Sequence, residues 1–302
     1  MGKKDRIFGS FCAIMTGVCW GVSGVFGQFL FETRGVTSLW LVPIRMFSAG
    51  LFLLCYSFLT PSGRPQAVAL FHNKRDLLQS ILAGVLGTMM FQLSFFLAVQ
   101  NSNAGTATVL QYLCPVITML YVCLRSRLLP TKIDVLSIIL ALSGIFLIST
   151  HGNFGSLVIT PAALFWGIAT AFFMFLNTVI PEGVYKKYPS TVVLGYAFVC
   201  GGLALIFICR PWRYHVDIDL AVIISMAFII LGGSVAAYMF YGNAIKRIGS
   251  AKSSLFASSE PVAAALLSAV WLKTSFSPID LVGFVLIIST LFILTLKGGS
   301  KS

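Results

Sequence analysis

The chain has 302 residues, of which 58% are hydrophobic and 10% are charged, and its formal net charge at pH 7 is +12. A soluble globular domain carries roughly 25% charged residues, so this composition excludes a water-soluble fold. The basic residues lie between apolar runs and form no single patch. This pattern argues against nucleic-acid binding and is typical of the loops of a membrane protein.

Runs without charged residues predict ten transmembrane helices, because about 20 apolar residues cross the hydrocarbon core of a bilayer. Two runs are too long for one helix. The run 77–124 divides at the polar segment 100–103, and the run 135–181 divides at 151–155. The predicted helices are residues 8–30, 38–59, the two parts of 77–124, the two parts of 135–181, 190–209, 220–242, 251–271 and 279–296.

An even number of helices puts both termini on one side of the membrane. Under this topology, sixteen Lys and Arg residues lie on the side of the termini, and four lie on the opposite side, at Arg34, Arg210, Arg213 and Lys273. Cytoplasmic loops are enriched in Lys and Arg. We therefore expect a multi-pass protein of a bacterial-type inner membrane, with both termini in the cytoplasm.

The chain matches itself at an offset of 146 residues, which predicts an internal duplication. The two copies are residues 1–150 and 151–302, with five helices in each. Because five is an odd number, the second copy should be inverted relative to the first, as in many secondary transporters. The matches are Phe8-Gly9-Ser10 with 154–156, Trp20-Gly21 with Trp166-Gly167, Gly87 with Gly233, Ala98 with Ala244, Pro115 with Pro261, and Asp134 with Asp280.

These motifs resemble the EamA-type branch of the drug/metabolite transporter (DMT) superfamily over nearly the whole chain. The resemblance rests on Trp20-Gly21 and Trp166-Gly167, on residues 43–49 and 110–116, and on residues 259–262. It implies a central cavity lined chiefly by the third, fourth, eighth and ninth helices, and export of amino acids or related metabolites. The chain departs from the family where a Gly-Glu pair often follows the fourth and ninth helices: residues 125–127 and 271–274 lack it.

Two charged residues lie well inside predicted helices. Glu260 is deep in the ninth helix, where a charge costs several kcal/mol unless it meets water, a partner or a proton. It is a candidate for proton coupling or for binding an amine; the alternative is a hydrogen-bonded residue that braces the helix before Pro261. Arg45 is a candidate for binding a substrate carboxylate, and the alternative is a side chain that snorkels or clamps neighbouring helices.

Pro115 and Pro261 are candidates for gating kinks, since proline removes a backbone hydrogen bond and bends a helix. Asp134 and Asp280 are expected at helix starts, where an acid suits the positive end of the helix. Aromatic and amide side chains are candidates for the cavity wall, with packing between helices as their alternative role. These predicted cavity residues are Trp20, Gln92, Gln111, Tyr112, Trp166 and Tyr238.

The sequence thus predicts an all-α polytopic membrane protein that transports small metabolites, most of all amino acids or related solutes, by alternating access. It has no phosphate-binding loop for ATP. Its three histidines lie in loops, which disfavours an intramembrane enzyme or a metal site. We expect no metal and no cofactor; the expected partners are a small-molecule substrate, the lipid bilayer and protons as coupling ion. A flippase for lipids or lipid-linked sugars, with a laterally open groove, is the alternative.

Overall fold

The computed structural model describes residues 3–127, 129–153 and 158–299, and within them all regular structure is helical. Nine helices of this described part are long and apolar enough to cross a membrane. One more apolar helix begins at Pro278. A helix satisfies its backbone hydrogen bonds internally, which a chain surrounded by lipid requires. The protein is therefore an all-helical polytopic membrane protein.

The first half of the chain contains eight α-helices and one π-helical segment. They are α1 (Lys3–Arg34), α2 (Ser38–Leu59), α3 (Gly63–His72), α4 (Lys74–Leu82), the π-helix η1 (Ala83–Met89), α5 (Met90–Asn101), α6 (Ala104–Gln111), α7 (Cys114–Ser126) and α8 (Lys132–Thr150). The helix α3 lies in a predicted loop.

The second half repeats this order with small differences. It contains α9 (Pro161–Val179), α10 (Glu182–Tyr185), α11 (Ser190–Cys209), the 3-10 helix η2 (Pro211–Arg213), α12 (Leu220–Ala227), the π-helix η3 (Phe228–Ala236), α13 (Ala237–Ile248), α14 (Ser250–Ala257), α15 (Ser259–Trp271) and α16 (Pro278–Gly299).

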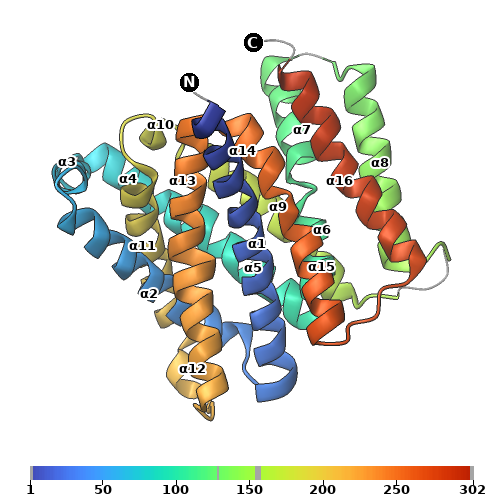
Figure 1. Cartoon of the computed structure of the whole chain (residues 1–302), viewed down its shortest axis with the longest axis horizontal. Coiled ribbons are helices and arrows are strands. Elements are labelled where there is room, and N and C mark those ends of the chain that lie inside the picture. Colours follow the sequence, from blue (N-terminus) through green and yellow to red (C-terminus); the bar gives the residue numbers. More distant parts are fainter. Residues whose placement is uncertain (1–2, 128, 154–157, 300–302) are drawn as a thin grey trace.

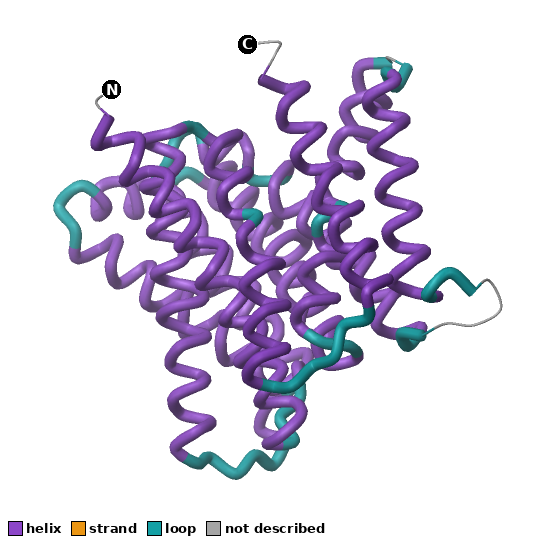
Figure 2. The backbone as a smooth tube through the Cα atoms, turned by 45° about the vertical axis from the view of Figure 1, so that its right-hand side comes forward, coloured by secondary structure: helices purple, strands orange, loops and turns teal. Residues whose placement is uncertain are grey.

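The long helices run between two ends of the molecule, and most loops lie at those ends (Figure 2). Both chain termini lie at the same end, which we call the terminus end (Figure 1). Large apolar side chains such as Phe207, Leu266 and Val285 are each more than 60% exposed. In water such a surface would be unfavourable, so these side chains are suited to contact with lipid.

The fourth and ninth predicted helices each correspond to one candidate span, Ala104–Ser126 and Lys252–Trp271, and the helix is interrupted inside each span, close to the predicted bends at Pro115 and Pro261. The first break separates α6 from α7 at Tyr112, and the second separates α14 from α15 at Ser258. A proline follows each break within three residues, Pro115 in α7 and Pro261 in α15. Proline lacks an N–H group and clashes with the preceding turn, so the helix cannot run through these sites unchanged.

Several structural features recur at the 146-residue offset. The π-helix η1 starts at Ala83 and η3 starts at Phe228, so their spacing agrees with this offset to within one residue. The two breaks follow it as well, since Ser258 is 146 residues after Tyr112. The helix starts of α8 and α16 also match: Asp134 caps α8 with Thr131, and Asp280 bonds in the same way to Ser277. These contacts confirm Asp134 and Asp280 as helix-start residues, while the match of 8–10 with 154–156 involves residues outside the described part.

The two halves pack against each other in equivalent pairs. Helix α1 packs against α13 and α14, and its counterpart α9 packs against the equivalent helices α5 and α6. Helix α2 packs against its counterpart α11, and α8 against α16. The main core contains residues of both halves, including the fully buried Phe96 and Phe198. Each hydrophobic cluster of the described residues contains side chains from both halves.

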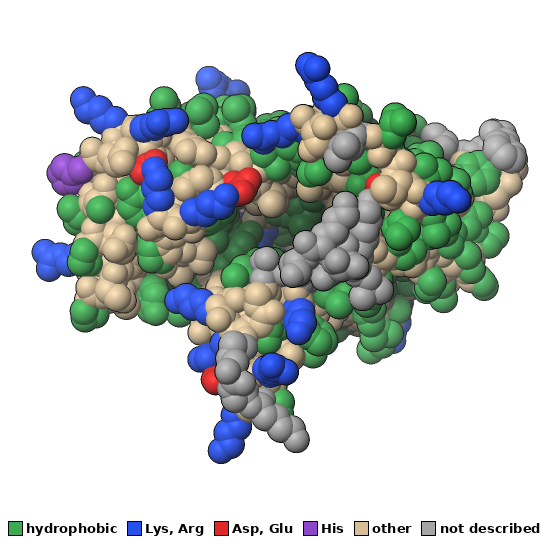
Figure 3. Space-filling model, turned by 90° about the horizontal axis from the view of Figure 1, so that it is seen from above, with side chains coloured by type: hydrophobic (Ala, Val, Ile, Leu, Met, Phe, Trp, Pro, Cys, Tyr) green, Lys and Arg blue, Asp and Glu red, His purple; other side chains and the backbone are tan. Residues whose placement is uncertain are grey.

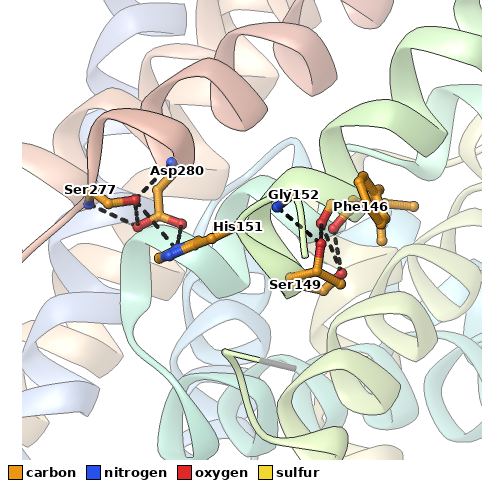
Figure 4. A network of polar contacts seen from close by, with 8 residues as sticks. Phe146, Ser149, His151, Gly152, Ser277 and Asp280 are labelled. Atoms are coloured by element: carbon orange, nitrogen blue, oxygen red, sulfur yellow. Dashed lines mark hydrogen bonds and ion pairs between the residues drawn. The ribbon is translucent and has the colours of Figure 1, made fainter. Parts of the chain in front are cut away.

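A polar network joins α8 to α16 at the end opposite the termini (Figure 4). Helix α8 ends at His151, whose backbone has a left-handed φ of 50°. His151 Nε2 lies 2.9 Å from Asp280 Oδ1 and 3.3 Å from Ser277 Oγ. Because Ser277 and Asp280 also cap α16, the end of one helix is fixed to the start of the other.

Candidate functional site

Glu260 lies where the two interrupted helices meet. Its side chain is buried, with 4% of its surface exposed. Gln111 Nε2 donates to Glu260 Oε1 over 3.1 Å, and the Tyr112 hydroxyl lies 3.4 Å from Glu260 Oε2. The same hydroxyl lies 3.2 Å from the Ala257 carbonyl oxygen, so its one proton is shared between two acceptors. A carboxylate of the second half is thus held by two donors of the first half.

The helix breaks explain why these side chains converge. Gln111 is the last residue of α6, and Tyr112 follows it in the break. Glu260 is in the first turn of α15, just after the second break. The start of a helix carries partial positive charge and unpaired N–H groups, which favour a carboxylate there. Within the described residues, no Lys or Arg forms an ion pair with Glu260.

A glycine brings α1 directly onto the start of α15. A Cβ atom added at Gly21 would lie 2.6 Å from the Glu260 carbonyl oxygen and 2.9 Å from the Ala264 nitrogen. Its repeat counterpart Gly167, in α9, is equally close to the Leu110 side chain of α6. The glycines of the two Trp-Gly motifs therefore allow each half to contact an interrupted helix of the other half.

Arg45 of α2 is a second buried charged residue, and it contacts the second half of the chain. Its side chain is 4% exposed. Its Nε donates to Ser234 Oγ over 3.1 Å, and its Nη1 donates to Gln92 Oε1 over 3.2 Å. The guanidinium carbon lies 4.8 Å from the centre of the Phe96 ring. Arg45 therefore points into the helix bundle, which rules out snorkelling to the membrane surface.

Tyr238 of α13 connects the surroundings of these two charges. Its ring centre lies 5.4 Å from that of Trp20 and 5.6 Å from that of Phe198. Ser234, which accepts from Arg45, lies four residues before Tyr238, and Trp20 directly precedes Gly21, which lies against the Glu260 backbone. An aromatic wall from α1, α11 and α13 therefore lies beside both polar clusters.

A cavity of about 290 Å³ opens beside Tyr238. It is walled by α2, α3, α11, α13 and the loops that join them at the terminus end. Figure 3 shows that this end is hollowed at its centre and carries Lys and Arg side chains around the hollow. Lys246 also lines the cavity, eight residues after Tyr238 on the same helix, so the cavity extends about 12 Å along α13. Of the four helices expected to line a central cavity, the eighth contributes Tyr238, Met239 and Gly242 to this one.

At the opposite end, the buried side chain of Gln28, in α1, joins several segments of the chain. Its Nε2 donates to Glu32 Oε1 over 2.8 Å and to Thr274 Oγ1 over 3.0 Å. Its Oε1 accepts from the Ala104 backbone nitrogen over 2.9 Å and from Ser268 Oγ over 3.1 Å. We call this set of contacts the Gln28 clamp. It ties α1 to the start of α6 and to α15.

The structure brings most of the predicted site residues into two groups, with one exception. Trp166 lies on α9, and its ring contact is with Phe165, at 5.0 Å between centres. Gln28 was missed in the sequence; the available signal was an amide within an apolar helix. The first group is Gln111, Tyr112 and Glu260, beside Pro115 and Pro261; the second is Gln92 with Arg45, beside Tyr238 and Trp20.

The fold and the buried charges between its halves define a polytopic membrane protein of the transporter class. The EamA-like transporter family matches residues 7–150 and 161–296, so the chain belongs to this family and contains two EamA repeats. The resemblance predicted from the sequence motifs is confirmed. A general role in transport follows from the membership.

Three relatives are similar over most of the chain. The uncharacterized inner membrane transporter YicL of Salmonella typhimurium is 34% identical over 302 residues, which cover 100% of this chain and 99% of YicL. The uncharacterized transporters YyaM and YetK of Bacillus subtilis are 25% and 24% identical, over 74% and 84% of this chain and 74% and 77% of their own lengths. A solved crystal structure covers 100% of both chains with a TM-score of 0.60 at 15% identity, which shows a shared fold.

Proposed function

We propose that this protein is a secondary transporter that exports or exchanges amino acids or related small solutes by alternating access. The proposal rests mainly on the surroundings of Glu260. A buried carboxylate without a cationic partner in the described part of the chain lies at the crossing of two broken helices, one from each half. Broken helices between inverted repeats form the substrate sites of many secondary transporters.

The proposed architecture is ten transmembrane helices in two inverted repeats, residues 1–150 and 151–302. The recurrence of π-helices, breaks and caps at one offset supports the repeats. Both termini lie at one end of the molecule (Figure 1), which supports an even number of crossings with α16 as the tenth helix. The excess of Lys and Arg at the terminus end supports its placement in the cytoplasm.

In the proposed transport cycle, the cavity opens alternately to one end of the molecule and to the other. In the described conformation, the cavity extends to Tyr238 from the terminus end, and the Gln28 clamp closes the other end. The second conformation has the clamp broken and the cavity closed. Because the two halves are built alike, each can adopt the other's arrangement at a small energetic cost. In both states Glu260 needs a proton or a cationic group to compensate its charge.

The test is uptake of a labelled panel of amino acids and metabolites into proteoliposomes, with and without an imposed pH gradient. We expect saturable transport that responds to the gradient in the wild type and loses that response in Glu260→Gln. Glu182→Gln is the matched control, because Glu182 pairs with Lys186 at the surface and its side chain is 64% exposed. The control should transport like the wild type.

Other outcomes contradict parts of the proposal. Transport that ignores both the gradient and Glu260→Gln would assign the protein to facilitators and Glu260 to a structural role. Transport of lipids or lipid-linked sugars, without transport of any soluble solute, would favour the flippase.

A further inference from the structure

We propose that the buried hydroxyl groups of Thr88 and Ser234 are paired latches, which hold the two π-helices in one conformation of the transport cycle. The inference rests on the proposed alternating access. It adds the contacts that must break when the molecule changes from one conformation to the other. Thr88 lies in η1 and Ser234 lies in η3, 146 residues later, so they are equivalent positions of the two repeats.

Each hydroxyl bonds to its own helix in the register of a π-helical turn. The Thr88 hydroxyl lies 3.3 Å from the Ala83 carbonyl oxygen, and the Ser234 hydroxyl donates to the Ile229 carbonyl oxygen over 3.1 Å. Both acceptors lie five residues earlier in the chain. In a regular α-helix, a Ser or Thr hydroxyl reaches the carbonyl three or four residues earlier. The two hydroxyls therefore stabilise the wider π-helical turns.

Each hydroxyl also bonds to the other half of the chain. Thr88 Oγ1 lies 2.6 Å from Asn177 Oδ1 of α9, and Ser234 Oγ accepts from Arg45 Nε of α2 over 3.1 Å. The side chains of Thr88 and Ser234 are at most 1% exposed, so water does not take the place of these partners. A buried polar group that loses its partner is unfavourable. The turn of η1 is therefore tied to α9, and the turn of η3 is tied to α2.

A glycine directly before each hydroxyl brings the other half into close contact. A Cβ atom added at Gly87 would lie 2.8 Å from Asn177 Cα in α9, and one added at Gly233 would overlap the Ser23 side chain in α1. Helices α1 and α9 are counterparts in the two repeats. The same arrangement therefore occurs twice: a close helix contact, a π-helical turn and a hydroxyl that is bonded across the halves.

The two π-helices lead to opposite ends of the molecule. Helix α13 follows η3 and runs to the terminus end, where Lys246 lines the cavity. Helix α5 follows η1 and runs to the other end, where Gln100 Oε1 accepts from the Ser38 backbone nitrogen at the start of α2. Bends concentrate at π-helical turns, because these interrupt the regular backbone hydrogen bonds. Bending at η3 therefore moves the wall of the cavity, and bending at η1 moves the opposite end.

The experiment measures the distance across each end by pulsed electron paramagnetic resonance of the spin-labelled protein in nanodiscs. The seven native cysteines are replaced by alanine, and one pair of labelled cysteines is introduced at a time. At the terminus end the pair is Ser62→Cys with Asn243→Cys, since both residues line the cavity. At the other end the pair is Leu97→Cys with Ile208→Cys, the equivalent positions at the 146-residue offset.

We expect Thr88→Val and Ser234→Ala each to favour the second conformation by about fivefold, the effect of one lost hydrogen bond. In both variants the distance at the terminus end should become shorter and the distance at the other end longer, because the cavity closes as the Gln28 clamp opens. Asn177→Leu should act like Thr88→Val. Both substitutions remove the same contact, so together they should shift the populations no further than either does alone.

The matched control is Ser94→Ala. The buried Ser94 hydroxyl donates to the Met90 carbonyl oxygen, four residues earlier in the same helix, over 2.7 Å. The control should keep both distances of the wild type. The Tm of each variant, measured without label, separates a change of conformation from loss of folding.

The inference is overturned if Thr88→Val and Ser234→Ala give the distances of the control, or if the effects of Thr88→Val and Asn177→Leu add. Broader distributions at both ends, without changes in opposite directions, would also overturn it, because they indicate general loosening. The result is separable from transport. Opposite changes at the two ends, in a protein that takes up no solute, would contradict the proposed function and leave the latches standing. Uptake by the wild type with unchanged distances in the variants would do the reverse.

Discussion

Several polar side chains inside the bundle bond across the two halves of the chain. Thr88 Oγ1 lies 2.6 Å from Asn177 Oδ1, which joins η1 to α9. Arg45 bonds to Ser234, and Gln111 bonds to Glu260, in the same crosswise way. A hydrogen bond to a charged group contributes about 1.5–3 kcal/mol. The charged contacts therefore help to bind the two halves together.

The hydroxyl of Tyr112 is expected to matter for transport more than for folding. Tyr112→Phe keeps the ring and removes the donor that faces Glu260. We expect the transport rate to fall by about tenfold, the equivalent of one lost hydrogen bond to a charged group. The measurement is initial uptake in proteoliposomes.

The control for this substitution is Tyr121→Phe. The Tyr121 hydroxyl accepts from Arg125 Nη1 over 3.0 Å and has no contact with Glu260. Its uptake should equal that of the wild type. Equal rates for all three proteins would assign Tyr112 to packing alone.

The π-helices and the helix breaks lie where helices of one half pack against helices of the other half. Helix η1 packs against α9 and α11, and η3 packs against α1 and α2. A π-helical turn weakens the regular hydrogen-bond ladder and often occurs at functional sites. The breaks at Tyr112 and Ser258 leave four helix ends inside the protein. Bending at these points requires fewer broken hydrogen bonds than bending of a regular helix.

Close packing of α1 on α15 is expected to depend on Gly21. Gly21→Ala adds a Cβ atom that would lie 2.6 Å from a backbone oxygen, which cannot move aside as a side chain does. Overpacking of this kind costs about 1–3 kcal/mol. The measurement is thermal unfolding of the purified protein in detergent, in which the Tm of the variant should fall.

Gly24→Ala on the same helix is the matched control. Its added Cβ atom would lie 3.4 Å from the Phe95 ring and 3.5 Å from Ala104 Cβ, which is ordinary contact. Alanine also favours a helix over glycine by roughly 1 kcal/mol. The control should therefore keep or raise the Tm, and an equal loss in both variants would contradict the packing argument.

On the scale of the whole molecule, the two ends differ in how they are closed. At the end opposite the termini, the Gln28 clamp and the stacked rings of Phe29 and Trp271, 5.0 Å apart, join α1 to the second half. At the terminus end, a cavity separates α13 from α2 and α11. The described cavity therefore lies at the terminus end.

The Gln28 clamp is expected to set the balance between the two conformations. Gln28→Leu removes its four hydrogen bonds, among them the one that holds the Ala104 backbone N–H. We expect the peptides that contain Ala104 and Thr274 to exchange hydrogen for deuterium about tenfold faster, since about 1.4 kcal/mol corresponds to a tenfold change. Mass spectrometry of the exchanged protein is the measurement.

Gln79→Leu provides the control at the other end. Gln79 Nε2 donates to the Ile180 carbonyl oxygen over 2.6 Å, so this amide also joins the two halves. Loss of the Gln79 amide should leave hydrogen–deuterium exchange near Ala104 unchanged. Faster exchange at Ala104 in both variants would indicate general loosening instead of a clamp.

Much of the site was predictable from residue type and spacing. An acid inside an apolar run, as Glu260 is, cannot lie against lipid, so its inward position follows from solvation alone. The prolines and the 146-residue offset indicated where the helices would deviate and which sites correspond. The contacts of Gln111 and Tyr112 with Glu260 were not predictable, because they span about half the chain. Trp166 shows the limit, since its repeat match to Trp20 did not bring it to the same partners.

By itself, the sequence determined the membrane setting, the apolar helices and the presence of two buried charges, because these follow from the transfer of each residue between water and lipid. The tertiary structure decided which groups those charges meet, which end of the molecule is closed and where the cavity lies. These depend on helix crossings between residues far apart in the chain, such as Gly21 with Glu260 and Gln28 with Thr274. Local periodicity records which face of a helix is apolar, but not which helix of the other half will cover it.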